Sequence, residues 1–162
     1  MLSNTILTSL NDQIAAEFGA SNFYLQVAAW FDNNNYEGFA KYFRKQSDEE
    51  RQHGLKIVDY LLETSSGVQI KDIQAPDNYF VSCLGIFEAV YALEDKVTSL
   101  ISNIYKISVL EGDYATQIFL QWYVQEQVRS MRDASYNLNK IRQIGDDVGA
   151  LFEFDEYLGE KE

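Results

Sequence analysis

The sequence predicts an all-α fold, namely a four-helix bundle with a long crossover between the second and third helices and a short C-terminal fifth helix. Three observations support it. Apolar residues recur three and four positions apart through four long stretches, which is the spacing of one face of an α-helix. The only proline is Pro76, so no other position forces a helix to break. Short turns separate the first two and the last two stretches, whereas a long connection separates the two pairs.

The first two helices form one predicted hairpin. The first covers about residues 4–31 and ends at DNNNYEG, where asparagines favour a turn, and the second covers about residues 37–62. The connection from Thr64 to Phe80 is rich in turn-forming residues. When extended, it reaches about 55 Å. That is enough to run the length of the bundle and to start the third helix parallel to the second.

The second predicted hairpin follows this connection. The third helix begins near Val81 and ends near Gly112, since glycine is the usual residue just past a helix end. The fourth covers about residues 114–144. Because the turn between them is short, these two helices should be antiparallel neighbours. The bundle itself is therefore expected at about residues 4–144.

A short fifth helix is expected at about residues 146–158, after the break at GDDVG. Residues 1–162 then make one domain. The fifth helix is more apolar than its length requires, so we expect it to contact other subunits. We expect the same of the aromatic side chains Tyr36 and Phe39.

Composition excludes several classes of protein. The 162 residues are 46% hydrophobic and 14% aromatic, which is enough for a packed core. The formal net charge of −12 argues against nucleic acid or an anionic membrane as a partner. No stretch approaches the roughly 18 apolar residues of a membrane span, and the first residues lack the pattern of a signal peptide. The single cysteine, Cys83, excludes an intrachain disulfide and suits a cytoplasmic location.

Polar residues interrupt the apolar seam of each long helix near its middle. These residues are Glu17, Glu50 with His53, Glu94, and Gln127. The interval of 33 residues between Glu17 and Glu50 recurs between Glu94 and Gln127. The two hairpins therefore place polar groups at the same depth, and in this alignment His53 corresponds to Ser130.

Burying several carboxylates together is costly unless something neutralises them. No lysine or arginine falls on the four seams, so either protons or metal cations must do so. Carboxylates with one imidazole suit iron, manganese or zinc, and Glu50 and His53, three residues apart, lie on one helix face. The residues predict a dinuclear metal site, with a purely structural polar layer as the alternative.

The motifs around these residues resemble those of the ferritins, specifically of the haem-free bacterial type. They are AAEFGASNFYL at 15–25, EERQHG at 49–54, LED at 93–95 and FLQWYVQEQV at 119–128. The resemblance covers essentially the whole chain, including the long crossover and the short fifth helix.

The resemblance implies roles for individual residues. Glu17, Glu50 and His53 hold a first iron, and Glu50 bridges to a second iron held by Glu94 and Gln127. The resemblance also makes Tyr24 a candidate electron donor beside the iron pair, although a core aromatic with a satisfied hydroxyl is an equally good interpretation of its position.

The implied function is iron storage. Two ferrous ions per subunit are oxidised by dioxygen or hydrogen peroxide at this ferroxidase centre, and ferric mineral is deposited inside a homo-oligomeric shell of 24 subunits. The alternatives are a di-iron oxidase or peroxidase that stores nothing, and a metal-buffering bundle.

The sequence also departs from the family pattern. Glu49 and Glu126 remain as candidates for a third iron site, but Arg129 and Ser130 stand where bacterial relatives usually carry further glutamates. We expect no haem, because a second E-x-x-H motif and a methionine at the expected interface position are both missing.

Overall fold

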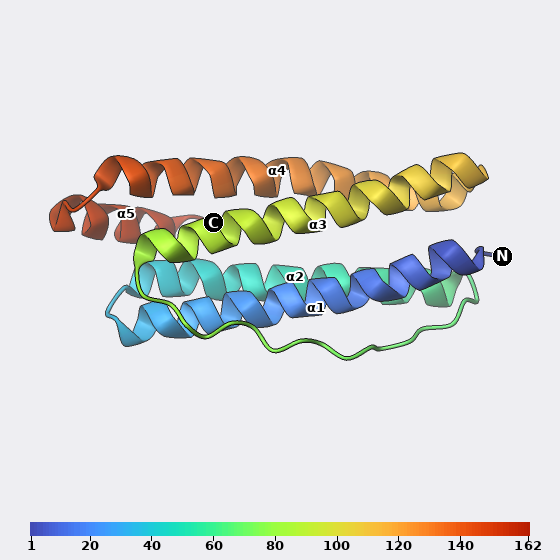
Figure 1. Ribbon diagram of the computed structural model, residues 1–162, viewed down its shortest axis with the longest axis horizontal. Coiled ribbons are helices and arrows are strands. Elements are labelled where there is room, and N and C mark those ends of the chain that lie inside the picture. The colour runs from blue at the N-terminus through green and yellow to red at the C-terminus, as the bar shows by residue number, and fades with distance from the viewer.

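A computed structural model describes all residues from 1 to 162 and contains five α-helices and no strand (Figure 1). The predicted fold class is confirmed. The helices are α1 (Asn4–Asn33), α2 (Glu37–Glu63), α3 (Cys83–Glu111), α4 (Tyr114–Ile144) and α5 (Val148–Glu160). None of them combines the length and the apolar character that crossing a membrane requires.

Local sequence signals begin and end the helices. Ser3, Ser82 and Asp113 precede α1, α3 and α4, and each side chain accepts a hydrogen bond from the backbone N–H three residues further on. Gly112 ends α3 in the left-handed conformation, with φ of 67°, as its position predicts. The turn between α1 and α2 uses Asn35 in the same region, with φ of 64°, which asparagine adopts more easily than most residues.

The long crossover gives the bundle its topology. It leaves the end of α2, follows α1 along the bundle and enters α3 at the opposite end, so that α3 runs parallel to α2 (Figure 1). Asn11 attaches its first part, because the Asn11 amide donates to Gly67 O at 3.0 Å and accepts from Gln69 N at 2.7 Å. The backbone of an irregular segment is thereby satisfied by a buried side chain of α1.

The apolar core consists of two clusters with a polar layer between them. The larger cluster has 16 buried residues and surrounds Phe31, Phe43 and Phe87 near the α5 end. The smaller has 11 and surrounds Leu10 and Ile57 at the other end. Helix periodicity predicts this division, because the seam glutamates fall where the apolar residues of all four helices are interrupted.

One part of the sequence-based interpretation is wrong. Phe39 is fully buried and packs edge to face against Phe154 of α5, with ring centroids 5.7 Å apart, so it does not face another subunit. α5 itself has two faces: Phe154 and Leu158 join the larger cluster, whereas Phe152 and Tyr157 stay exposed.

A buried carboxylate attaches α5 to the start of α2. Asp155 accepts hydrogen bonds from the backbone N–H groups of Gly38, at 3.2 Å, and of Phe39, at 2.7 Å. The residue that precedes α2 makes no capping hydrogen bond with its side chain, so Asp155 caps the N-terminus of α2 instead. It also places a negative charge at the positive end of the helix dipole. The backbones approach closely here, since a Cβ on Gly159 would lie 2.6 Å from Gly38 Cα.

The substitution Gly38→Ala should detach α5. The new Cβ would overlap the backbone carbonyl of Asp155, and overpacking of this kind costs about 1–3 kcal/mol. We expect a lower midpoint of thermal unfolding by circular dichroism, together with faster amide hydrogen exchange in α5. Gly67→Ala is the matched control, because nothing lies within 4 Å of a Cβ at Gly67. Equal stability of the two variants would contradict this account of the contact.

Candidate metal centre

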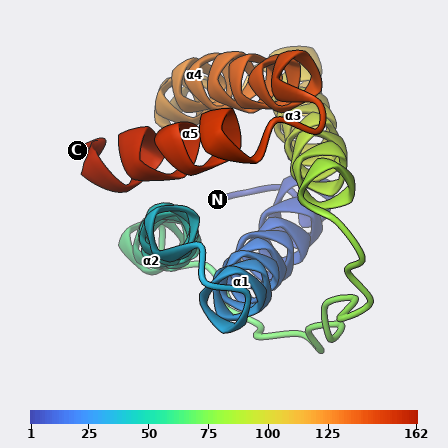
Figure 2. The same cartoon turned by 90° about the vertical axis from the view of Figure 1, so that its left-hand side faces the viewer.

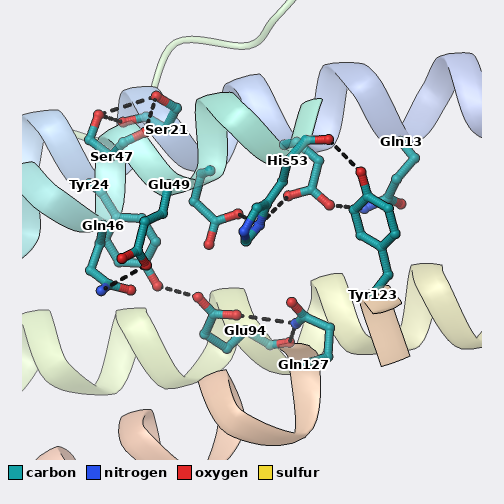
Figure 3. A network of polar contacts seen from close by, with 12 residues as sticks. Gln13, Ser21, Tyr24, Gln46, Ser47, Glu49, His53, Glu94, Tyr123 and Gln127 are labelled. Atoms are coloured by element: carbon teal, nitrogen blue, oxygen red, sulfur yellow. Dashed lines mark hydrogen bonds and ion pairs between the residues drawn. The ribbon is translucent and has the colours of Figure 1, made fainter. Parts of the chain in front are cut away.

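Polar side chains from all four long helices meet in the layer between the two apolar clusters (Figure 3). Each is at most 9% exposed. They are Glu17 from α1, Glu50 and His53 from α2, Glu94 from α3 and Gln127 from α4. The seam positions singled out in the sequence therefore lie at one level, although the ligand roles assigned to them stay predictions.

Three of these residues form the first half-site, which we define as Glu17, Glu50 and His53. One ligand atom of each lies within 4.8 Å of the other two, which is close enough for a single metal ion to bind all three. His53 Nδ1 is 3.1 Å from Glu50 Oε2 and 4.0 Å from Glu17 Oε2. Carboxylate oxygens with one imidazole nitrogen suit iron, manganese or zinc.

Two buried residues that the sequence analysis did not single out support the first half-site (Figure 3). Gln13 Nε2 donates to Glu17 Oε1 at 2.9 Å, while Glu17 Oε2 has no hydrogen-bond partner. The Tyr123 hydroxyl donates to the backbone carbonyl of His53 at 2.6 Å. The position of Gln13 four residues before Glu17, on the same helix face, was the available signal.

The second half-site consists of Glu94 and Gln127. The Tyr24 hydroxyl donates to Glu94 Oε1, so Tyr24 contacts this half-site, and its role as an electron donor stays a prediction. Gln127 Nε2 donates to Glu94 Oε2 at 3.2 Å and to Thr98 Oγ1 at 3.1 Å. Because Glu94 and Thr98 hold the amide nitrogen, the amide oxygen of Gln127 points toward the first half-site (Figure 3).

The electrostatics of the layer are unfavourable for free carboxylates. Burial, with repulsion from Glu50, raises the pKa of Glu17 well above its usual value. Burial raises the pKa of Glu50 to about 8, and the negative charges of Glu94 and Glu49 add to this shift. The pKa of Glu94 is raised by burial and lowered in part by the hydrogen bond from Tyr24. No lysine or arginine forms an ion pair with any of the three carboxylates. A bound cation would therefore remove the free-energy cost of burying them in ionised form.

A cleft of about 920 Å³ between α2 and α4 reaches the centre. α2 and α4 stand apart, with α5 between them at one end of the bundle, whereas α1 and α3 approach each other (Figure 2). Glu50, His53 and Glu94 line the cleft. Trp122 lies edge-on to the His53 ring at 5.1 Å, and Lys56 Nζ covers the Trp122 ring at 3.8 Å. A small hydrated ligand can therefore reach these ligand atoms from one side of the bundle.

The candidates for a third site lie on the wall of this cleft. Glu49 is exposed and accepts a hydrogen bond from Gln46 at 3.4 Å. Glu126 is half-buried and forms an ion pair with Arg129. The positive charge of Arg129 therefore lies against one of the two carboxylates that were candidates for a third iron site.

Comparisons with known proteins show the family to which the chain belongs. The family described as "Ferritin-like domain" matches residues 7–144. The "Bacterial non-heme ferritin" of Staphylococcus aureus (strain USA300) is 37% identical over 159 residues, covering 98% of this chain and 96% of the relative. That of Staphylococcus haemolyticus is 39% identical and covers 100% and 95%. An open-pore ferritin from the archaeon Archaeoglobus fulgidus matches with a TM-score of 0.97 and 35% identity over 100% of both chains.

The metal-free protein should lose stability as pH rises from about 5 to 8. The pKa of Glu50 is near 4.5 in an unfolded chain but near 8 in the folded protein. The stabilisation of the folded state by protonated Glu50 is therefore complete below pH 4.5 and is lost as the pH passes 8. For each proton that the folded protein retains and the unfolded chain has lost, the free energy of unfolding falls by about 1.4 kcal/mol per pH unit. In Glu50→Gln the midpoint of thermal unfolding should depend less steeply on pH than in the parent. The exposed control Glu63→Gln should keep the pH dependence of the parent. Zn²⁺, which is redox-inert, should restore stability at pH 8. A Glu50→Gln profile identical to that of the parent would contradict this assignment.

Proposed function

Because this chain belongs to the ferritin family, we propose that the buried layer described above is the centre at which it oxidises ferrous iron. The chain is a non-haem ferritin, an iron-storage protein with ferroxidase activity. The observation that supports this location is the first half-site, in which two buried carboxylates without a lysine or arginine partner converge with His53 within 4.8 Å. No other group of acidic, histidine and cysteine side chains in the chain has this arrangement.

The proposed centre binds two iron ions per subunit as substrate. Glu17, Glu50 and His53 bind the first, and Glu94 and Gln127 bind the second, with Glu50 bridging. The raised pKa values of Glu17 and Glu50 support this, since iron binding would replace protons that the buried carboxylates otherwise retain. The second ion has a neutral amide in place of a carboxylate and an imidazole, so it should bind more weakly and leave more easily.

The oxidation itself needs little from the protein beyond positioning. Each ferrous ion gives up one electron, and dioxygen or hydrogen peroxide accepts them. Tyr24 is the candidate for a further electron, because its hydroxyl proton can pass to Glu94 Oε1 along the existing hydrogen bond as the electron leaves. Ferric iron would then leave through the cleft between α2 and α4 toward a mineral.

Storage requires a shell, and we propose the 24-subunit assembly that the family resemblance implies, with residues 1–162 acting as one ferritin-like domain. The exposed aromatic residues Phe152 and Tyr157 of α5 are candidates for subunit contacts. The Archaeoglobus structures described as an open-pore ferritin and as its engineered closed form match this chain with TM-scores of 0.97 and 0.96. The shape of the subunit alone therefore does not distinguish these two assemblies. The single cysteine favours a cytoplasmic location.

Substituting Glu50→Ala should slow iron oxidation by about 100-fold or more, because both ions lose a ligand. Stopped-flow absorbance after mixing with ferrous iron measures the rate. Glu63→Ala, on the exposed face of the same helix, is the matched control and should oxidise iron like the parent. A parental rate in Glu50→Ala would place the oxidation elsewhere.

Aerobic loading with ferrous salt separates storage from the alternatives. A storage shell should sediment as one large particle that retains many more ferric ions than the centre can bind. A metal-buffering bundle would stop at the capacity of its binding sites, and a di-iron oxidase or peroxidase would turn over without retaining iron. A chain that sediments as a monomer would contradict storage.

Arg129 should weaken the third iron site. In Arg129→Gln, Glu126 loses its ion pair, so a third Zn²⁺ should bind up to about fivefold more tightly, since an exposed pair is worth at most about 1 kcal/mol. Calorimetric titration measures this. Arg132→Gln is the control, because Arg132 is another exposed arginine of α4 and pairs with Asp133 instead of Glu126. Identical titrations of both variants would exclude Glu126 from a third site.

A further inference from the structure

The two carboxylate oxygens of Glu17 have different surroundings. Gln13, which is only 1% exposed, donates to Glu17 Oε1 at 2.9 Å. Glu17 Oε2 is buried without a hydrogen-bond partner and lies 4.0 Å from His53 Nδ1. A buried acceptor without a partner is costly, so the oxygen that faces the first half-site is the one left free for a ligand.

We propose that Gln13 is a positioning residue that makes Glu17 bind the first iron through Oε2 alone. This rests on the proposed ferroxidase centre. A carboxylate with two free oxygens can chelate an ion through both, and a hydrogen bond to one oxygen, from a side chain that burial holds in place, opposes this. Groups that hydrogen-bond to metal ligands commonly orient them and tune the ion in this way.

A glutamine suits this position because it donates without adding charge. A lysine or arginine in the same place would form a salt bridge with Glu17 and compete with the iron. Gln13 also lies one helical turn before Glu17 on α1, so the backbone sets its distance. A carboxylate that uses one oxygen instead of two leaves one more coordination position on the first ion for water or the oxidant.

Gln13→Met tests the proposal, because methionine fills a similar volume but cannot donate the hydrogen bond. Co²⁺, bound to the full-length protein without oxygen, is the probe. Chelation by both oxygens of Glu17 raises the coordination number, so the visible Co²⁺ band should weaken and shift. Iron oxidation at saturating iron should slow by about 10- to 100-fold.

The matched control is Asn11→Leu, which also removes a buried amide of α1, one that binds the crossover instead of the centre. It should lower the unfolding midpoint while leaving the Co²⁺ spectrum and the rate at saturating iron unchanged. An unchanged spectrum in Gln13→Met, or the same loss of rate in both variants, would overturn the proposal. A Glu17→Ala variant that keeps the parental Co²⁺ spectrum would instead show that the proposed centre itself is wrong.

Discussion

Three buried carboxylates with no lysine or arginine among them must be neutralised, and the rest of the bundle is arranged around that requirement. The carboxylates come from α1, α2 and α3 at one level, and α4 adds an amide. Apolar clusters close the layer on both sides, so water does little to reduce the penalty. Protons reduce it in the metal-free protein, as the raised pKa of Glu50 indicates, and cations can replace them.

Much of the fold follows from patterns that the sequence displays directly. Four long periodic stretches and a single proline predict the helices, and the length of the crossover predicts that α3 runs parallel to α2. The sequence also predicts that four polar residues lie at the same depth of the bundle, namely Glu17, Glu50, Glu94 and Gln127. The helix period and the repeated interval of 33 residues are both visible in the sequence.

Contacts between distant segments could not be predicted in this way. Phe39 looked like an interface residue because its partner, Phe154, lies on α5 at the far end of the sequence. Asp155 looks like a surface residue, although it caps α2. Thr98 acts on the second half-site through a single hydrogen bond, whose geometry no residue spacing encodes. These residues depend on how elements dock, which follows from the whole core.

Because of the cleft, the centre is open on one side of the bundle and closed on the other. It reaches the centre between α2 and α4, while α1 and α3 pack against each other on the opposite side (Figure 2). An ion that binds the second half-site as proposed would therefore have a path out of the centre on that side. If the subunits of a closed assembly turn this face inward, iron that leaves the centre through the cleft enters the interior of the assembly. All subunits would then release iron into one common compartment, and diffusion alone would fill it.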